Sequence, residues 1–133
     1  VVAQTAGRPA GLAEGQRWFV RTGTAASVRA SDGCVESPQV NFPATIERIY
    51  ATVHGYNLNA GVRMSAEWLY EGTPVWTEGW TIDRNWDDLC MWFYIDRETV
   101  DIVPGNWSVR LFADGFQLEE AMTFLIQRGG ETG

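Results

Sequence analysis

The sequence predicts an all-β domain, an antiparallel β-sandwich of about seven short strands. Runs of alternating apolar and polar residues are separated by Gly, Pro, Asn and Asp turn signals roughly every 8 to 15 residues. Asp114-Gly115 lies between two such runs, and Asp-Gly favours the type I′ turn of a tight hairpin. No run of the sequence repeats its apolar residues at the helical period.

The first half of the chain holds three predicted strands. Residues 16–21 form the first of them. Residues 27–30 form a short second strand, and the Ser-Asp-Gly sequence at 31–33 forms the turn that follows. Residues 46–55 alternate strongly, which places the apolar side chains of this third strand on the core face and His54 on the polar, solvent-facing side.

Alternation predicts the remaining strands at residues 62–70, 75–77 and 90–96 and in the two arms of a final hairpin over 104–126. Trp68 stands in the middle of its strand, on the apolar face, where a sandwich core accommodates a large ring. Trp107 alternates in the same way in the first arm of the hairpin. We therefore expect both rings in the core.

Composition excludes several classes of function. At 133 residues and 45% hydrophobic content, the chain forms one domain large enough to bury a core. A net charge of −7 argues against nucleic acid or an anionic membrane as partner, and no apolar run reaches the about 18 residues of a membrane span. His54 is the only histidine, and no nucleophile is paired with it, so a non-catalytic protein without a cofactor is expected.

The two cysteines, Cys34 and Cys90, lie far apart and lack partners at metal-ligand spacing. A disulfide is the simplest interpretation if the chain is exported, and two buried free thiols are the alternative. The start of the sequence lacks the basic and apolar regions of a secretory signal. We expect an extracellular or cell-surface protein whose signal peptide has been removed.

A cluster of oxygen-bearing side chains follows the predicted edge strand. Asp83, Asn85, Asp87 and Asp88 could surround a calcium ion, although the Gly and the closing Glu of a calcium loop are missing. The alternative is a solvated loop rich in turn-forming residues. Asp83, Asp87 and Asp88 are the weak calcium candidates.

Three tryptophans, Trp76, Trp80 and Trp86, lie on the predicted edge strand and the loop after it. Exposed rings in a row form a stacking platform for a polysaccharide, and neighbouring carboxylates bond to sugar hydroxyls. The alternative is that two of the three rings cover the open end of the core. These residues are the candidate ligand or partner contacts.

A set of short motifs resembles a known family. The motifs are Phe42-Pro43, Tyr50, Glu67-Trp68, Gly72, Trp76, Trp80, Trp92-Phe93, Pro104-Gly105-Asn106-Trp107, Asp114-Gly115 and Phe124-Leu125-Ile126. Together they are similar to an immunoglobulin-like accessory domain found at the ends of secreted bacterial proteins, including trypsin-like peptidases. The resemblance covers residues 42–126 and implies an immunoglobulin-like sandwich that is extracellular and non-catalytic, with no established ligand.

The ends of the chain complete the predicted organisation. Residues 1–15 form an extended N-terminal segment, residues 16–127 the sandwich, and residues 128–133 a tail. An extended segment can add a strand to the open sheet of a neighbouring copy, with Val1 and Val2 among its contacts. Head-to-tail contacts of this kind build filaments. We therefore expect a self-assembling structural subunit, the alternatives being a glycan-binding or adhesive module and an accessory domain of a secreted enzyme.

Overall fold

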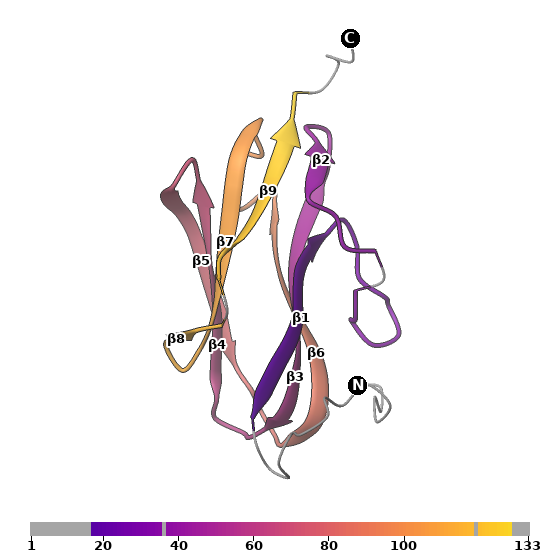
Figure 1. Cartoon of the computed structure of the whole chain (residues 1–133), viewed down its shortest axis with the longest axis vertical. Coiled ribbons are helices and arrows are strands. Elements are labelled where there is room, and N and C mark those ends of the chain that lie inside the picture. Colours follow the sequence, from indigo (N-terminus) through magenta and orange to yellow (C-terminus); the bar gives the residue numbers. More distant parts are fainter. Residues whose placement is uncertain (1–16, 36, 119, 129–133) are drawn as a thin grey trace.

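The computed structural model describes residues 17–35, 37–118 and 120–128 and forms an all-β sandwich of two sheets (Figure 1). Its described strands are β1(Trp18–Ala25), β2(Asn41–Pro43), β3(Arg48–Leu58), β4(Arg63–Tyr70), β5(Thr73–Thr81), β6(Trp86–Asp96), β7(Gly105–Ala113), β8(Phe116–Gln117) and β9(Met122–Gln127). One sheet has the order β1-β3-β6, and the other β2-β9-β7-β4-β5 with β8 beside β7. Pairing is antiparallel except between β2 and β9. The predicted all-β sandwich is confirmed, with nine described strands where about seven were predicted.

The core lies between the two sheets and is built around aromatic rings. Trp68 is fully buried, and its ring meets the Phe124 ring edge-on at 6.0 Å between centroids. Phe42 meets the same Phe124 ring at 5.7 Å, also edge-on. Trp107 is buried and stacks on Phe124 at 6.1 Å. The core positions predicted for Trp68 and Trp107 are therefore confirmed, and burial of each such ring stabilises the fold by about 1.5–3 kcal/mol.

The polar ends of the two core tryptophans are satisfied. The Trp107 indole N–H donates to the carbonyl of Val103 at 2.9 Å. The Trp68 indole N–H donates to Glu78 Oε2 at 3.1 Å, and the backbone of Tyr94 hydrogen-bonds to the same carboxyl. Burial raises the pKa of Glu78 above its usual value, although these two hydrogen bonds oppose the rise. Glu78 thus bridges from β5 to the edge of β6.

The Asp-Gly hairpin forms as predicted. Asp114 and Gly115 have φ of 52° and 85°, and positive φ at both central residues defines the type I′ turn. The turn is tied to the neighbouring strand because Asp114 Oδ1 accepts from the Arg63 N–H at 2.9 Å. The short β8 pairs with β7 directly after the turn, and β9 then continues along β7.

Some predicted boundaries are wrong. Residues 27–30 are not a strand but part of a loop between β1 and β2. The strand predicted to end at residue 55 continues to Leu58, and the short edge strand predicted at 75–77 spans Thr73–Thr81 as β5. Trp86 already belongs to β6. Residues 1–16 and 129–133, which include the predicted N-terminal segment, lie outside the described residues.

Candidate functional site

The outer face of the three-stranded sheet carries a buried histidine–aspartate pair and the disulfide. Side chains of β3 and β6 stand opposite one another there, with Thr52 opposite Trp92 and His54 opposite Cys90. Thr52 and His54 are 3% and 2% exposed, although both point away from the core. The prediction that His54 is a surface residue is therefore wrong, because another segment covers this face.

The covering segment is the loop after β1, and a disulfide fastens it. Cys34 in the loop is bonded to Cys90 on β6, with a Cα–Cα distance of 5.0 Å across a sequence separation of 56. Gly33, with φ of 77°, lies so close to the Trp92 ring that an added Cβ would stand 2.2 Å from a ring carbon. The predicted disulfide is confirmed, and glycine is required beside it because of both the positive φ and the close ring.

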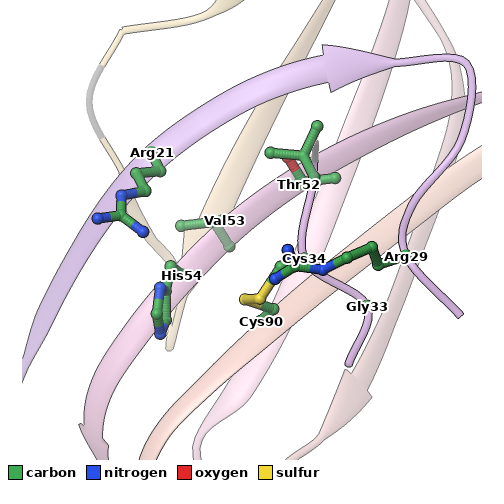
Figure 2. A pocket seen from close by; sticks show the side chains of 9 residues that line it. Arg21, Arg29, Gly33, Cys34, Thr52, Val53, His54 and Cys90 are labelled. Carbon is green, nitrogen blue, oxygen red and sulfur yellow. A yellow bond between two sulfur atoms is a disulfide. The ribbon is translucent and has the colours of Figure 1, made fainter. Parts of the chain in front are cut away.

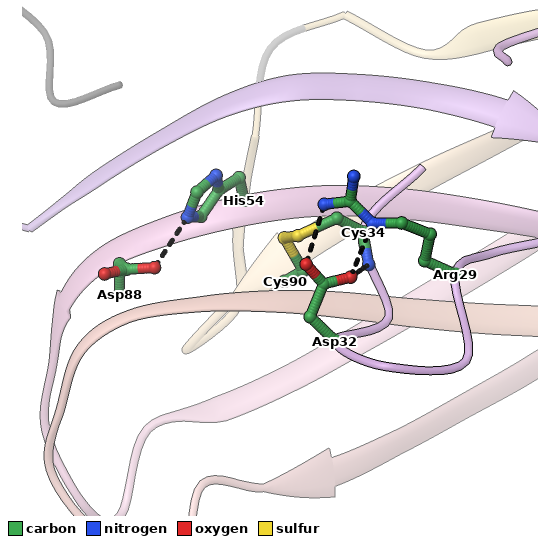
Figure 3. A network of polar contacts seen from close by, with 6 residues as sticks. All are labelled: Arg29, Asp32, Cys34, His54, Asp88 and Cys90. Atoms are coloured by element: carbon green, nitrogen blue, oxygen red, sulfur yellow. Dashed lines mark hydrogen bonds and ion pairs between the residues drawn. A yellow bond between two sulfur atoms is a disulfide. The ribbon is translucent and has the colours of Figure 1, made fainter. Parts of the chain in front are cut away.

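An ion pair shapes the same loop (Figure 3). Arg29 Nε donates to Asp32 Oδ1 at 3.0 Å, and Arg29 Nη2 donates to Asp32 Oδ2 at 2.7 Å. The Cys34 N–H also donates to Asp32 Oδ1, at 2.9 Å. The Asp32 side chain is only 2% exposed. The Arg29 hydrogen bond and that of the Cys34 N–H lower the pKa of the Asp32 carboxyl.

His54 and Asp88 form a buried pair beside the disulfide (Figure 3). His54 Nε2 lies 3.0 Å from Asp88 Oδ1, and the imidazole stacks on the Tyr56 ring at 4.6 Å. The other ring nitrogen, Nδ1, is buried and has no hydrogen-bond partner, the one such side-chain atom among the described residues. Buried polar atoms are nearly always hydrogen-bonded, so this atom needs an explanation.

A pocket of about 220 Å³ opens between β1, β3 and the disulfide loop (Figure 2). Its lining residues are Arg21, Arg29, Gly33, Cys34, Val35, Thr52, Val53, His54 and Cys90. Two guanidinium groups and the unpartnered imidazole therefore border one small space, while the chain as a whole has a net charge of −7.

A β-bulge places Arg21 at this pocket. Val20 is opposite His54 and Gly23 is opposite Thr52, so β1 has one extra residue there. Arg21 has φ of 57°, in the left-handed region that costs a non-glycine residue about 1–3 kcal/mol. No hydrogen bond or ion pair joins the Arg21 side chain to another residue in the described part of the chain.

The tryptophans predicted as a platform for sugars are all half-buried. Trp76, Trp80 and Trp86 pack against the core, and the Trp80 ring is 6.1 Å from that of Phe93. The guanidinium of Arg84 lies 4.2 Å from the centre of the Trp86 ring. Their role as ligand contacts stays a prediction. The large apolar side chains that are exposed are instead Trp18, Val40, Val75, Trp92, Val103 and Phe116.

The calcium candidates are not brought together as a three-carboxylate site. Asp83 and Asp87 are exposed, whereas Asp88 is buried against His54. Asn85 Oδ1 accepts from the Ala60 N–H at 2.9 Å. Across the described ranges, no group of three or more His, Cys, Asp or Glu side chains is placed to hold a metal ion. Val1 and Val2 lie outside those ranges.

Comparison with protein-family models finds no match, and comparison with curated proteins finds none either. Among solved structures, the chain is similar to the solution NMR structure of the CARDB domain of PF1109 from Pyrococcus furiosus. That similarity has a TM-score of 0.37 and 14% sequence identity, over 70% of this chain and 89% of the other.

The disulfide bears on the setting of the protein. Disulfides persist in oxidising compartments and are rare in the cytosol, so the Cys34–Cys90 bond indicates a non-cytoplasmic setting. The described residues contain no helix with the length and apolarity needed to cross a bilayer.

Proposed function

We propose that this protein is a non-catalytic extracellular structural module that assembles with copies of itself by adding a strand to the open edge of β6. The observation that supports it is how well each edge strand is protected against pairing with another chain. The edge strands of the two described sheets are β1, β6, β2 and β5. An unprotected edge offers a row of backbone groups to another chain, so most proteins block their edges with prolines, bulges or short strands.

Three of the four edges are blocked in this way. β1 has a bulge after Val20, and β2 is three residues long and contains Pro43. β5 contains Pro74, and its pairing with β4 is irregular near Leu69. β6 is different, because it spans 11 residues and pairs with β3 without any register shift. It is the edge best suited to accept a strand.

The direction of its backbone groups supports the same proposal. The Tyr94 N–H faces the Glu78 carboxyl across the gap to β5, so it points to the edge of β6, and an incoming strand would replace this one side-chain contact. N–H groups alternate sides along a strand, so that of Trp92 points to the same edge. The incoming strand in this proposal comes from residues 1–15 of a neighbouring copy, which the sequence predicts to be extended and which lie outside the described residues.

The test compares Trp92→Pro with Trp92→Ala. Both variants lose the ring, but only proline loses the backbone donor at the edge, where proline is tolerated. We expect the unmodified chain and Trp92→Ala to form concentration-dependent oligomers in analytical ultracentrifugation. Trp92→Pro and a chain lacking residues 1–15 should remain monomers with unchanged circular dichroism. A monomeric unmodified chain, or normal assembly of the truncated chain, would refute the proposal.

A second candidate is an accessory domain within a longer secreted protein. In Figure 1 the first described strand, β1, rises from one end of the sandwich and the last, β9, finishes at the other. A module whose chain enters and leaves at opposite poles fits into a row of domains. The intact mass of the native secreted product separates the two candidates, since the chain alone has a mass of 14.9 kDa. A product of that mass excludes the accessory role.

A further inference from the structure

The pocket beside the Cys34–Cys90 disulfide has features that self-assembly does not use. We propose that it binds a small hydroxy acid, with Arg21 holding the oxyanion and His54 Nδ1 accepting a hydrogen bond from a ligand hydroxyl. Its volume of about 220 Å³ is below the range of drug-sized sites and suits one compact molecule, such as a single acidic sugar.

The hydrogen bonding of His54 is the reason for proposing a hydroxyl group on the ligand. A carboxylate accepts hydrogen bonds, so Nε2 is the nitrogen that donates across the 3.0 Å contact to Asp88. In the neutral imidazole, which is the form that binds the ligand in this proposal, Nδ1 carries a lone pair and acts as an acceptor. The residue is 2% exposed, and no described residue donates to Nδ1. A donor supplied by a ligand satisfies this atom.

The position of the Arg21 side chain is the reason for proposing a carboxylate on the ligand. The bulge in β1 and the positive φ of 57° bring this side chain to the pocket rather than leaving the strand regular. Backbone strain of this kind collects at binding sites, where the surrounding structure maintains it. A guanidinium presents a planar fork of donors that matches a carboxylate. In Figure 2, Arg21 extends from β1 beside the β3 strand that carries His54.

The remaining wall is held in place by an ion pair and the disulfide. Arg29 lines the pocket while its two hydrogen bonds to Asp32 fix its orientation. The disulfide holds the loop that carries Arg29 against β6. A preformed wall lowers the entropy lost when a small ligand binds.

Because His54 is the only histidine, labelling with ¹⁵N-histidine gives one side-chain Nδ1 resonance to follow. The probe is D-glucuronate at up to about 10 mM, a concentration that detects millimolar affinity. We expect a saturable shift of the Nδ1 resonance. D-Glucose has the hydroxyls without the carboxylate, and acetate has the carboxylate without a hydroxyl. Each should therefore bind at least about tenfold more weakly than glucuronate.

Two variants localise the binding. Arg21→Gly removes the side chain and also relieves the positive φ, so a loss of binding cannot come from a strained fold. We expect it to weaken glucuronate binding about tenfold or more. Arg84→Gln is the matched control, since it removes one exposed positive charge outside the pocket, and it should bind as the unmodified chain does.

Three results would overturn the proposal. The first is an Nδ1 resonance that glucuronate does not move, which would leave the pocket with bound water only. The second is an equal shift with D-glucose, which would remove the role of the oxyanion. The third is unchanged binding by Arg21→Gly.

Discussion

Removal of the Cys34–Cys90 disulfide tests whether the covering loop is held mainly by that bond. The double variant Cys34→Ala/Cys90→Ala removes both sulfur atoms of the bond. In the chain-entropy model, a crosslink across a sequence separation of 56 stabilises the fold by about 4 kcal/mol at 25 °C. With a urea m-value of about 2 kcal/mol/M, typical of a small domain, the unfolding midpoint should fall by about 2 M.

The assay is equilibrium unfolding in urea, followed by tryptophan fluorescence. The unmodified protein in reductant is the control and should reproduce the midpoint of the variant, whereas reductant should not change the variant itself. Loosening of the loop also uncovers Trp92, so its ring should become more accessible to iodide before global unfolding begins. A midpoint within about 0.5 M of the oxidised protein would contradict this prediction and show that the loop is held by its other contacts.

Three further predictions concern single side chains. Gly33→Ala should destabilise the fold by about 1–3 kcal/mol in the same urea assay, because of the positive φ and the Trp92 ring. Glu78 has a raised pKa, so its ionised form opposes folding, and stability should fall as pH rises from about 4.5; thermal melts of Glu78→Gln should lack that slope. Asp32 has a lowered pKa, so its contribution is present above pH 3.8 and lost as pH falls further; Asp32→Asn should be less stable at pH 7 and lack the acid-side loss.

Alternation along the strands predicted the core faces because it depends only on local geometry. Each residue of a strand faces opposite to its neighbours, so Trp68 and Trp107 could be placed in the core from their own segments. The Asp114-Gly115 turn was equally local, since two positive φ values suffice to define it. These features need no knowledge of the rest of the chain.

The burial of His54 could not be predicted from its own strand. Alternation correctly placed it on the face away from the core, but that face is covered by a loop bonded to β6 across 56 residues. The loop itself was misassigned, because the alternating residues at 27–30 resemble a strand. Their Arg29 instead pairs with Asp32 within the loop. The pocket depends on the loop that covers His54 and on the Arg29–Asp32 pair inside that loop. Neither can be read from the pattern of a single strand.

The position of Arg21 is a further case. In a regular strand each residue of β1 would pair with one residue of β3, whereas the register shifts after Val20. The residue that adopts the positive φ is Arg21 and not a glycine, so the sequence gives no sign of the bulge. The bulge therefore carries no local signal, and the pocket that it creates appears only in the folded chain.

The two proposed sites share β6 but use different groups, so each can fail without the other. Assembly depends on backbone groups at the open edge of β6, whereas the pocket depends on side chains that stand on the sheet's outer face. Arg21→Gly should therefore leave sedimentation unchanged while weakening the binding of glucuronate. Trp92→Pro removes the edge donor and the ring beside Gly33, and Trp92→Ala removes only the ring. If the two Trp92 variants bind glucuronate equally but only one assembles, the edge and the pocket act independently.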